Sequence, residues 1–207
     1  MTELTTDLIP AREANSDRLM VVLHGLGDSM EGYRDVPEAL RIPWLNCLLV
    51  NAPDPYYGGF SWYDYAGDAA PGVLRSRELL TRLLDSTRAK FPSERTVLFG
   101  FSQGCLMTLE TGLRYPHRLG GLIGVSGYLH DAEALVKELS PVATQQPILW
   151  THGTRDPLIP LKKVQDQVQA LKDAGLKIDW QVFEKQHTFV QREFEIIREF
   201  IVQRLGV

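Results

Sequence analysis

Ser102 lies between two glycines in the stretch Gly100-Phe101-Ser102-Gln103-Gly104, where an apolar run ends and a helical pattern begins. A G-x-S-x-G turn of this kind exposes the serine hydroxyl above a sheet, because the tight turn has no room for side chains at its flanking positions. The amino end of the following helix favours negative charge that develops near the hydroxyl. Together, the pentapeptide and its strand–helix context predict a nucleophile for acyl transfer.

A serine hydroxyl is a weak nucleophile until a base, itself oriented by an acid, removes its proton. In chain order the acid and then the histidine are expected after the serine. His187 follows the final apolar run and precedes the final helical pattern, so we expect it at the carboxyl end of a strand. His130 also follows a strand, His117 falls in a helix-to-strand connection at the opposite edge, and His152 is expected to brace a loop. The pattern favours His187 as the base.

Three aspartates compete for the role of the acid that orients this histidine. Asp156 follows a strand that ends in His152 and Gly153, and therefore falls at the same sheet edge as the serine. Asp131 precedes a helical pattern as an N-cap does, and Asp179 falls within a strand. The sequence favours Asp156.

An acyl-transfer site also needs two backbone N–H donors for the oxyanion. One is supplied by the residue after the nucleophile, Gln103, and the other by a loop after an early strand. That loop begins His24-Gly25-Leu26-Gly27, and its two glycines allow the backbone to approach a substrate closely. We expect the second donor to be the Leu26 N–H.

These residues must be positioned by the elements between them. Apolar runs without alternation predict strands buried on both faces, and apolar residues at helical spacing predict the helices between them. The alternation predicts an α/β fold, with a mostly parallel sheet and helices on both faces, in a single domain over residues 1–207. Residues 54–72 are aromatic, glycine-rich and too irregular for an element, which is typical of a functional loop. The expected strands are 18–25, 45–52, 95–100, 119–127, 147–153 and 177–184, and the expected helices include 73–91, 161–171 and 194–205.

The composition excludes several other classes of protein. The net charge is −4, and the basic residues form no patch of the kind that binds nucleic acid. No apolar run approaches the roughly 20 residues of a membrane helix. Cys47 and Cys105 are expected to be reduced and buried, no metal-type Cys/His spacing occurs, and no signal peptide is visible. These features predict a cytoplasmic protein without a transmembrane segment, metal or other cofactor.

Taken together, the motifs resemble the acyl-protein thioesterase and carboxylesterase family, small α/β-hydrolases that include lysophospholipases. The resemblance spans Leu23 to His187. It includes five segments: the oxyanion loop (Leu23–Ser29), an aromatic loop (Ser61–Asp64), the nucleophile elbow (Gly100–Cys105), the acid loop (His152–Pro160) and the histidine loop (Lys185–Phe189). It implies an α/β-hydrolase fold without a large lid domain. It also implies a catalytic triad of Ser102, Asp156 and His187, with Leu26 and Gln103 at the oxyanion hole. The family usually has glycine where this chain has Cys105, a small side chain that we expect to pack inward.

The resemblance implies a serine hydrolase that cleaves carboxylic esters and acyl thioesters of short to medium chain length through an acyl-serine intermediate. A lysophospholipase or a protein S-acyl thioesterase is the alternative, and a non-catalytic acyl-binding module is disfavoured by the complete Ser, Asp and His set. The expected substrate is a small-molecule or lipid-like acyl ester, and the expected assembly is a monomer or a homodimer. The candidate walls of the acyl pocket are Phe60, Trp62, Tyr63 and Leu158.

Overall fold

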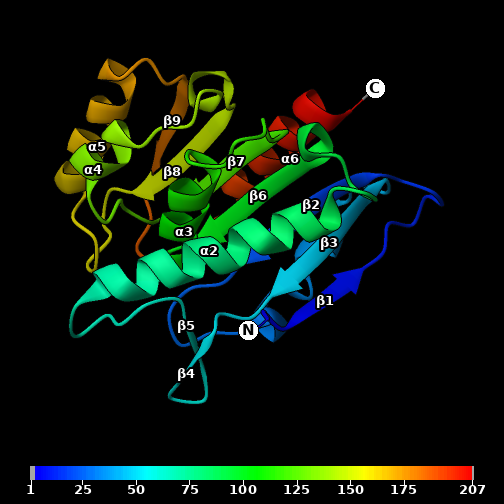
Figure 1. Ribbon diagram of the computed structural model, residues 1–207, viewed down its shortest axis with the longest axis horizontal. Helices are drawn as coiled ribbons and strands as arrows, with labels where there is room; N and C mark the ends of the chain where they lie inside the picture. The colour runs from blue at the N-terminus through cyan, green and yellow to red at the C-terminus, as the bar shows by residue number, and fades with distance from the viewer. Residues whose placement is uncertain (1–2, 207) are drawn as a thin grey trace.

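The centre of the protein is a seven-stranded sheet, shown in Figure 1 for the computed structural model, which describes residues 3–206. The strand order is β1-β3-β2-β6-β7-β8-β9. Only β1 (Thr6–Ile9) is antiparallel to its neighbour, β3 (Leu45–Val50), and it forms one edge of the sheet. The remaining strands are parallel: β2 (Arg18–Leu23), β6 (Thr96–Phe101), β7 (Gly121–Val125), β8 (Ile148–Gly153) and β9 (Ile178–Phe183).

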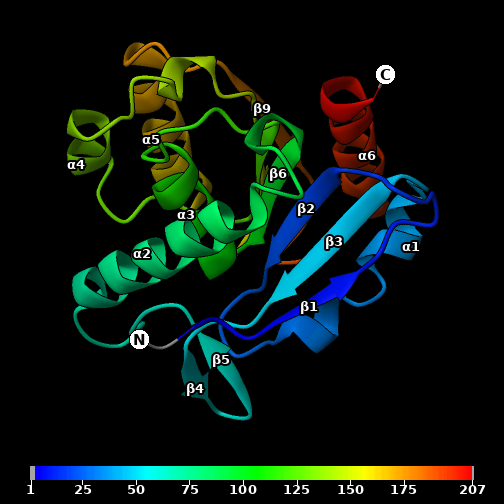
Figure 2. The same ribbon diagram turned by 45° about the vertical axis from the view of Figure 1, so that its right-hand side comes forward.

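Helices cover both faces of this sheet, as the apolar strands require (Figure 2). In β2, Leu19 and Val21 belong to one hydrophobic core, and the alternating Met20 and Val22 belong to the other. The first core includes residues of α2 (Ala69–Thr87), α3 (Gln103–Gly112), α4 (Ala132–Lys137) and α5 (Leu161–Asp173). The second includes residues of α1 (Val36–Leu40) and α6 (Gln191–Leu205). The predicted mostly parallel sheet with helices on both faces is confirmed.

All six predicted strands are present, each within a few residues of its expected ends. Helix α2 begins four residues before the expected position, where the Asp68 side chain accepts a hydrogen bond from the Ala70 N–H at 3.0 Å. Strand β1 was not predicted, because its residues are exposed or only partly buried and carry little apolar signal. Short 3-10 helices occur at Met30–Tyr33, Ser93–Arg95 and Ala143–Gln145.

The prediction that residues 54–72 contain no regular element is wrong. β4 (Asp54–Tyr56) and β5 (Gly59–Ser61) form an antiparallel hairpin, turned by Tyr57 and Gly58 at φ 42° and 89°. Strand β5 is held by the loop after β2, because Phe60 accepts from the Gly27 N–H and donates to the Asp28 carbonyl, both at 2.9 Å. The hairpin therefore fixes the loop that carries Leu26.

The connection between β7 and β8 contains only α4 and a 3-10 turn, and no lid domain is formed within residues 3–206. No helix in that range combines the length and apolar character needed to cross a bilayer. The carboxyl ends of β6, β8 and β9 lie at the same edge of the sheet, which is where ligands collect in folds of this class.

Candidate active site

Ser102 lies in the tight turn between β6 and α3, with φ 54° and ψ −114°. A non-glycine residue in this region of backbone space is strained, and the turn that adopts it places Ser102 at the wall of a cavity. The Ser102 N–H donates to the Val125 carbonyl at 2.9 Å, which ties the turn to β7. A Cβ atom on Gly100 would overlap the Gly104 carbonyl, and one on Gly104 would overlap the Leu23 carbonyl. Both glycines of the motif are therefore required by close backbone contacts.

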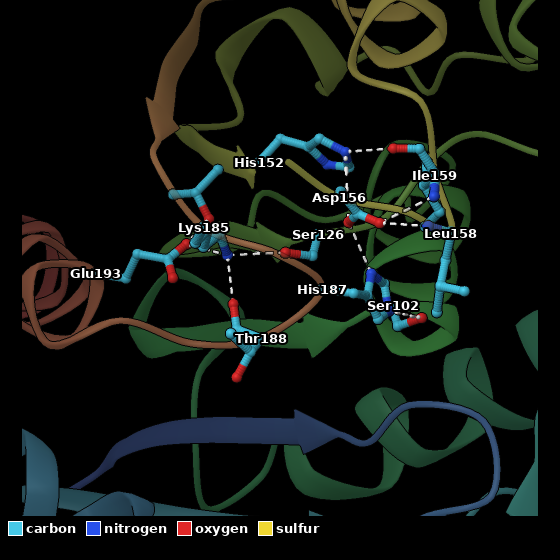
Figure 3. Close-up of polar contacts among 11 residues, drawn as sticks. Ser102, Ser126, His152, Asp156, Leu158, Ile159, Lys185, His187, Thr188 and Glu193 are labelled. Atoms are coloured by element: carbon cyan, nitrogen blue, oxygen red, sulfur yellow. Dashed lines mark hydrogen bonds and ion pairs between the residues drawn. The ribbon is translucent and has the colours of Figure 1, made fainter. Parts of the chain in front are cut away.

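The side chains of Ser102, His187 and Asp156 form a continuous hydrogen-bonded relay (Figure 3). His187 Nε2 lies 2.9 Å from Ser102 Oγ, and His187 Nδ1 lies 2.7 Å from Asp156 Oδ2. A carboxylate can only accept, so Nδ1–H donates to Asp156 and leaves Nε2 of the neutral ring as the acceptor for the serine hydroxyl. This tautomer suits removal of the hydroxyl proton.

The Asp156 carboxylate is fixed by its own loop. Its second oxygen accepts the backbone N–H groups of Leu158 and Ile159, each at 2.9 Å. Burial acts to raise the pKa of Asp156, but the hydrogen bonds from His187, Ile159 and Leu158 outweigh it and hold the pKa below its usual value. Asp156 is therefore an anion at neutral pH, with one oxygen directed at the histidine.

His152 braces this loop, as the sequence predicted, and its Nε2 also lies 3.6 Å from Asp156 Oδ2 (Figure 3). Its Nε2–H donates to the Ile159 carbonyl at 3.0 Å. Burial is the main cause that lowers the pKa of His152, so the ring is neutral at pH 7. On the other side of the relay, the His187 ring packs against Phe101, with ring centroids 5.0 Å apart.

The two expected oxyanion donors lie beside Ser102. Leu26 and Gln103 both line the same cavity as the serine. Within residues 3–206, neither backbone N–H donates a hydrogen bond to another protein group. The Gln103 side chain is buried and faces the aromatic loop, where it accepts from the Trp62 N–H at 3.0 Å and donates to the Tyr63 carbonyl at 3.1 Å.

A cavity of about 430 Å³ opens beside Ser102 and His187. Two of the predicted wall residues, Tyr63 and Leu158, line it. The prediction for Phe60 and Trp62 is corrected, because neither lines the cavity. Trp62 is fully buried and its indole N–H donates to the His24 carbonyl at 2.9 Å, while Phe60 packs against the core from β5.

Several other residues that line this cavity were not predicted from the sequence. Tyr128 follows the carboxyl end of β7, a position that alone could have indicated it, and its hydroxyl lies 3.0 Å from that of Tyr63. Lys163 lies with its ammonium 4.6 Å from the centre of the Tyr128 ring. The remaining lining residues that were not predicted include Tyr65, Ile159 and Pro160.

The structure separates the alternative residues from the relay. His117 is hydrogen-bonded to Arg88, and His130 is exposed. Asp131 caps α4 by accepting the Ala134 N–H at 2.9 Å, as its sequence position suggested, and Asp179 is an exposed residue of β9. No group of three or more His, Cys, Asp or Glu side chains within residues 3–206 is arranged to hold a metal ion.

Comparison with known proteins decides the family. Residues 5–205 match the phospholipase/carboxylesterase family. The chain belongs to that family. Acyl-protein thioesterase 1 of Schizosaccharomyces pombe is 37% identical over 158 residues, which cover 68% of this chain and 69% of the relative.

Solved structures of an esterase and of an acyl-protein thioesterase show the same fold. Esterase PE8 superposes with a TM-score of 0.89 and is 27% identical, over 99% of this chain and 100% of its own. Acyl-protein thioesterase 2 of Zea mays gives a TM-score of 0.83 at 25% identity, over 98% and 99% of the two chains. The expected α/β-hydrolase fold and the family resemblance are confirmed, and the chain is a hydrolase of carboxylic esters.

Proposed function

We propose that Ser102, His187 and Asp156 are the catalytic triad of a serine hydrolase that cleaves acyl esters and acyl thioesters. The single observation that carries this proposal is the relay, with 2.9 Å from Ser102 Oγ to His187 Nε2 and 2.7 Å from His187 Nδ1 to Asp156 Oδ2. The nucleophile, base and orienting acid are in contact in the order that acyl transfer requires.

In the first half-reaction, His187 Nε2 takes the proton from Ser102 Oγ as the oxygen attacks the acyl carbonyl. Asp156 holds Nδ1–H and stabilises the imidazolium that forms. The backbone N–H groups of Leu26 and Gln103 bind the oxyanion of the tetrahedral intermediate, an interaction whose loss typically costs about 10²–10³ in rate. The imidazolium then protonates the departing alcohol or thiol, which leaves an acyl-serine.

In the second half-reaction, water repeats the sequence on the acyl-serine. His187 takes a proton from the water, the hydroxide attacks the acyl carbonyl, and the imidazolium returns the proton to Ser102 Oγ. The carboxylic acid is released and the enzyme is regenerated. Each proton passes through one histidine, which is why a single relay serves both steps.

The acyl group is proposed to occupy the cavity beside Ser102, against Tyr63 and Leu158. Its apolar lining and its volume of about 430 Å³ suit a short to medium acyl chain on a small-molecule or lipid-like ester. The thioesterase activity is carried over from the names of the relatives in Schizosaccharomyces pombe and Zea mays. A lysophospholipid or an S-acylated protein is the alternative substrate.

A cytoplasmic location and a monomeric or homodimeric state complete the proposal. Both cysteines, Cys47 and Cys105, are free and buried, which suits a reducing compartment. The location is tested by fractionation of cells, and the assembly state by light scattering of the purified protein.

The test of the proposed function is a set of initial rates on p-nitrophenyl esters from C2 to C16, and on the matching acyl thioesters with a thiol reagent. Wild type, Ser102→Ala and a control, Ser86→Ala on the exposed face of α2, are compared side by side. We expect turnover by wild type and Ser86→Ala, and a loss of about 10⁶ in kcat for Ser102→Ala. Equal turnover by Ser102→Ala and wild type would contradict the assignment of the nucleophile.

A further inference from the structure

A buried ion pair lies beside His187, and the proposed mechanism does not use it (Figure 3). Lys185 Nζ lies 2.7 Å from Glu193 Oε1, and both side chains are fully buried. Lys185 comes from the loop after β9, two residues before His187, and Glu193 comes from the first turn of α6. Charged side chains are rarely buried without a partner, and here each charge faces the other.

The Lys185 side chain is hydrogen-bonded to the backbone on the other side of His187. Besides Glu193, its ammonium donates to the Ser126 hydroxyl and to the Thr188 carbonyl, each at 2.8 Å. The three N–H donors of the ammonium are therefore all used. Because the Thr188 carbonyl lies just after His187 and Lys185 just before it, these contacts fix the backbone on both sides of the histidine.

Glu193 connects Lys185 to other elements of the fold. Its Oε1 accepts from the Thr151 hydroxyl on β8 at 2.6 Å, and its Oε2 accepts from the Val190 N–H at 3.0 Å. At the other end, Ser126 follows Val125, whose carbonyl accepts the Ser102 N–H. The network therefore joins the histidine loop to β7, beside the nucleophile, and to β8, which leads to the acid loop.

Stability alone does not account for such a pair. A buried ion pair is often replaceable by apolar side chains of similar volume with no loss of stability, because removing two charges from water offsets their attraction. Apolar side chains lack directional contacts, whereas the three charge-assisted hydrogen bonds of Lys185 define one position for the loop. Catalysis is sensitive to that position, because a displacement of about 1 Å can cost about 10² in rate.

We infer that Lys185 and Glu193 are positioning residues that hold His187 in line with Ser102 and Asp156. The inference rests on the proposed triad. Neither side chain contacts the cavity beside Ser102, so the pair acts on the turnover step through His187 and leaves substrate binding unchanged.

The test replaces both charges at once, because removing one partner leaves the other charged and buried. In Lys185→Met/Glu193→Gln, methionine fills the volume of the lysine stem and glutamine can still accept the Val190 N–H. We expect kcat for p-nitrophenyl butyrate to fall about 10- to 100-fold. We expect KM and the melting temperature to stay near the wild-type values.

A matched control removes a second, largely buried ion pair at the far end of α3, in Arg114→Met/Glu110→Gln. This control is expected to retain the wild-type kcat. Ser126→Ala is a second test that changes no charge, and it should lower kcat severalfold with KM unchanged. It keeps the inference testable if the double variant fails to fold.

Adding the double change to His187→Ala separates positioning from a general structural role. If the pair acts through His187, the double change has no further effect on the residual rate of His187→Ala. A kcat equal to that of wild type in the folded double variant would overturn the inference. So would an equal loss of rate when the double change is made in wild type and in His187→Ala. If His187→Ala itself turned over like wild type, the proposed triad would fail instead.

Discussion

At the scale of single residues, the short contacts of the relay depend on the Asp156 carboxylate. One oxygen is occupied by two backbone N–H groups, so only the other is free to orient the histidine. The hydrogen bonds keep this carboxylate ionised despite its burial, and an anion is what stabilises the imidazolium formed during catalysis. An amide of the same shape has only one oxygen. If that oxygen accepts the two backbone N–H groups, the –NH2 group faces His187 and favours the tautomer with its proton on Nε2, which cannot take the serine proton.

Asp156→Asn is therefore expected to lower kcat by about 10⁴. The matched control is Asp131→Asn, because asparagine still caps α4 there and activity should be unchanged. Steady-state rates on p-nitrophenyl butyrate measure both variants. Full activity in Asp156→Asn, with a loss in Asp131→Asn, would move the role of the acid to Asp131.

The two thiols provide a second prediction at this scale. Burial raises the pKa of Cys47 to about 12 and raises that of Cys105 well above its usual range. Only the thiolate reacts, so neither thiol of the folded protein should react with a disulfide reagent at pH 8. We expect two reactive thiols per chain in guanidinium chloride and none without it. Rapid modification of the folded protein would show that one of these thiols is accessible.

At the scale of elements, the oxyanion loop and the aromatic loop support each other across the sequence. Phe60 is hydrogen-bonded to Gly27 and Asp28, and the Gln103 side chain holds Trp62 and Tyr63 at the start of α3.

The parallel strands were predictable because their apolar runs reflect burial on both faces. The β4–β5 hairpin was not, because contacts with residues distant in sequence hold it in place. The prediction that Trp62 lines the acyl pocket was wrong for a related reason. An aromatic residue can line a cavity or fill a core, and contacts with distant residues decide which.

Gln103→Ala tests the connection between these two loops. The buried Trp62 N–H loses its acceptor, so the free energy of unfolding should fall by about 1–3 kcal/mol. Gln169→Ala is the matched control, because Gln169 is an exposed residue of α5 and its loss should change little. Urea denaturation measures both variants. Equal free energies of unfolding for Gln103→Ala and wild type would contradict this support.

At the scale of the whole molecule, the sheet from Thr6 to Phe183 brings the elements of the site to one edge. A single domain over residues 1–207 stays a prediction, and this continuous sheet supports it.

The chain order of serine, acid and histidine was predictable from the sequence, because each of the three residues follows a strand. Lys185 and Glu193 carry no comparable signal, since charged residues near a loop are usually exposed.

Two buried histidines make the stability of the whole fold depend on pH. Burial is the main cause that lowers the pKa values of His24 and His152. The unfolded chain takes up protons at these residues below about pH 6.5 while the folded protein does not, so stability falls as the pH falls through that value. We expect a lower melting temperature at pH 5.5 than at pH 7.5. An equal or higher value at pH 5.5 would contradict the neutral state of these rings.

The proposed mechanism depends on the acylation of Ser102 during turnover, and trapping the intermediate detects this step. Enzyme mixed with p-nitrophenyl butyrate is quenched in acid within milliseconds, digested and analysed by mass spectrometry. We expect a butyryl group on the peptide that contains Ser102, and no such adduct in Ser102→Ala. A butyryl group on another residue in actively turning-over wild-type enzyme would contradict this mechanism.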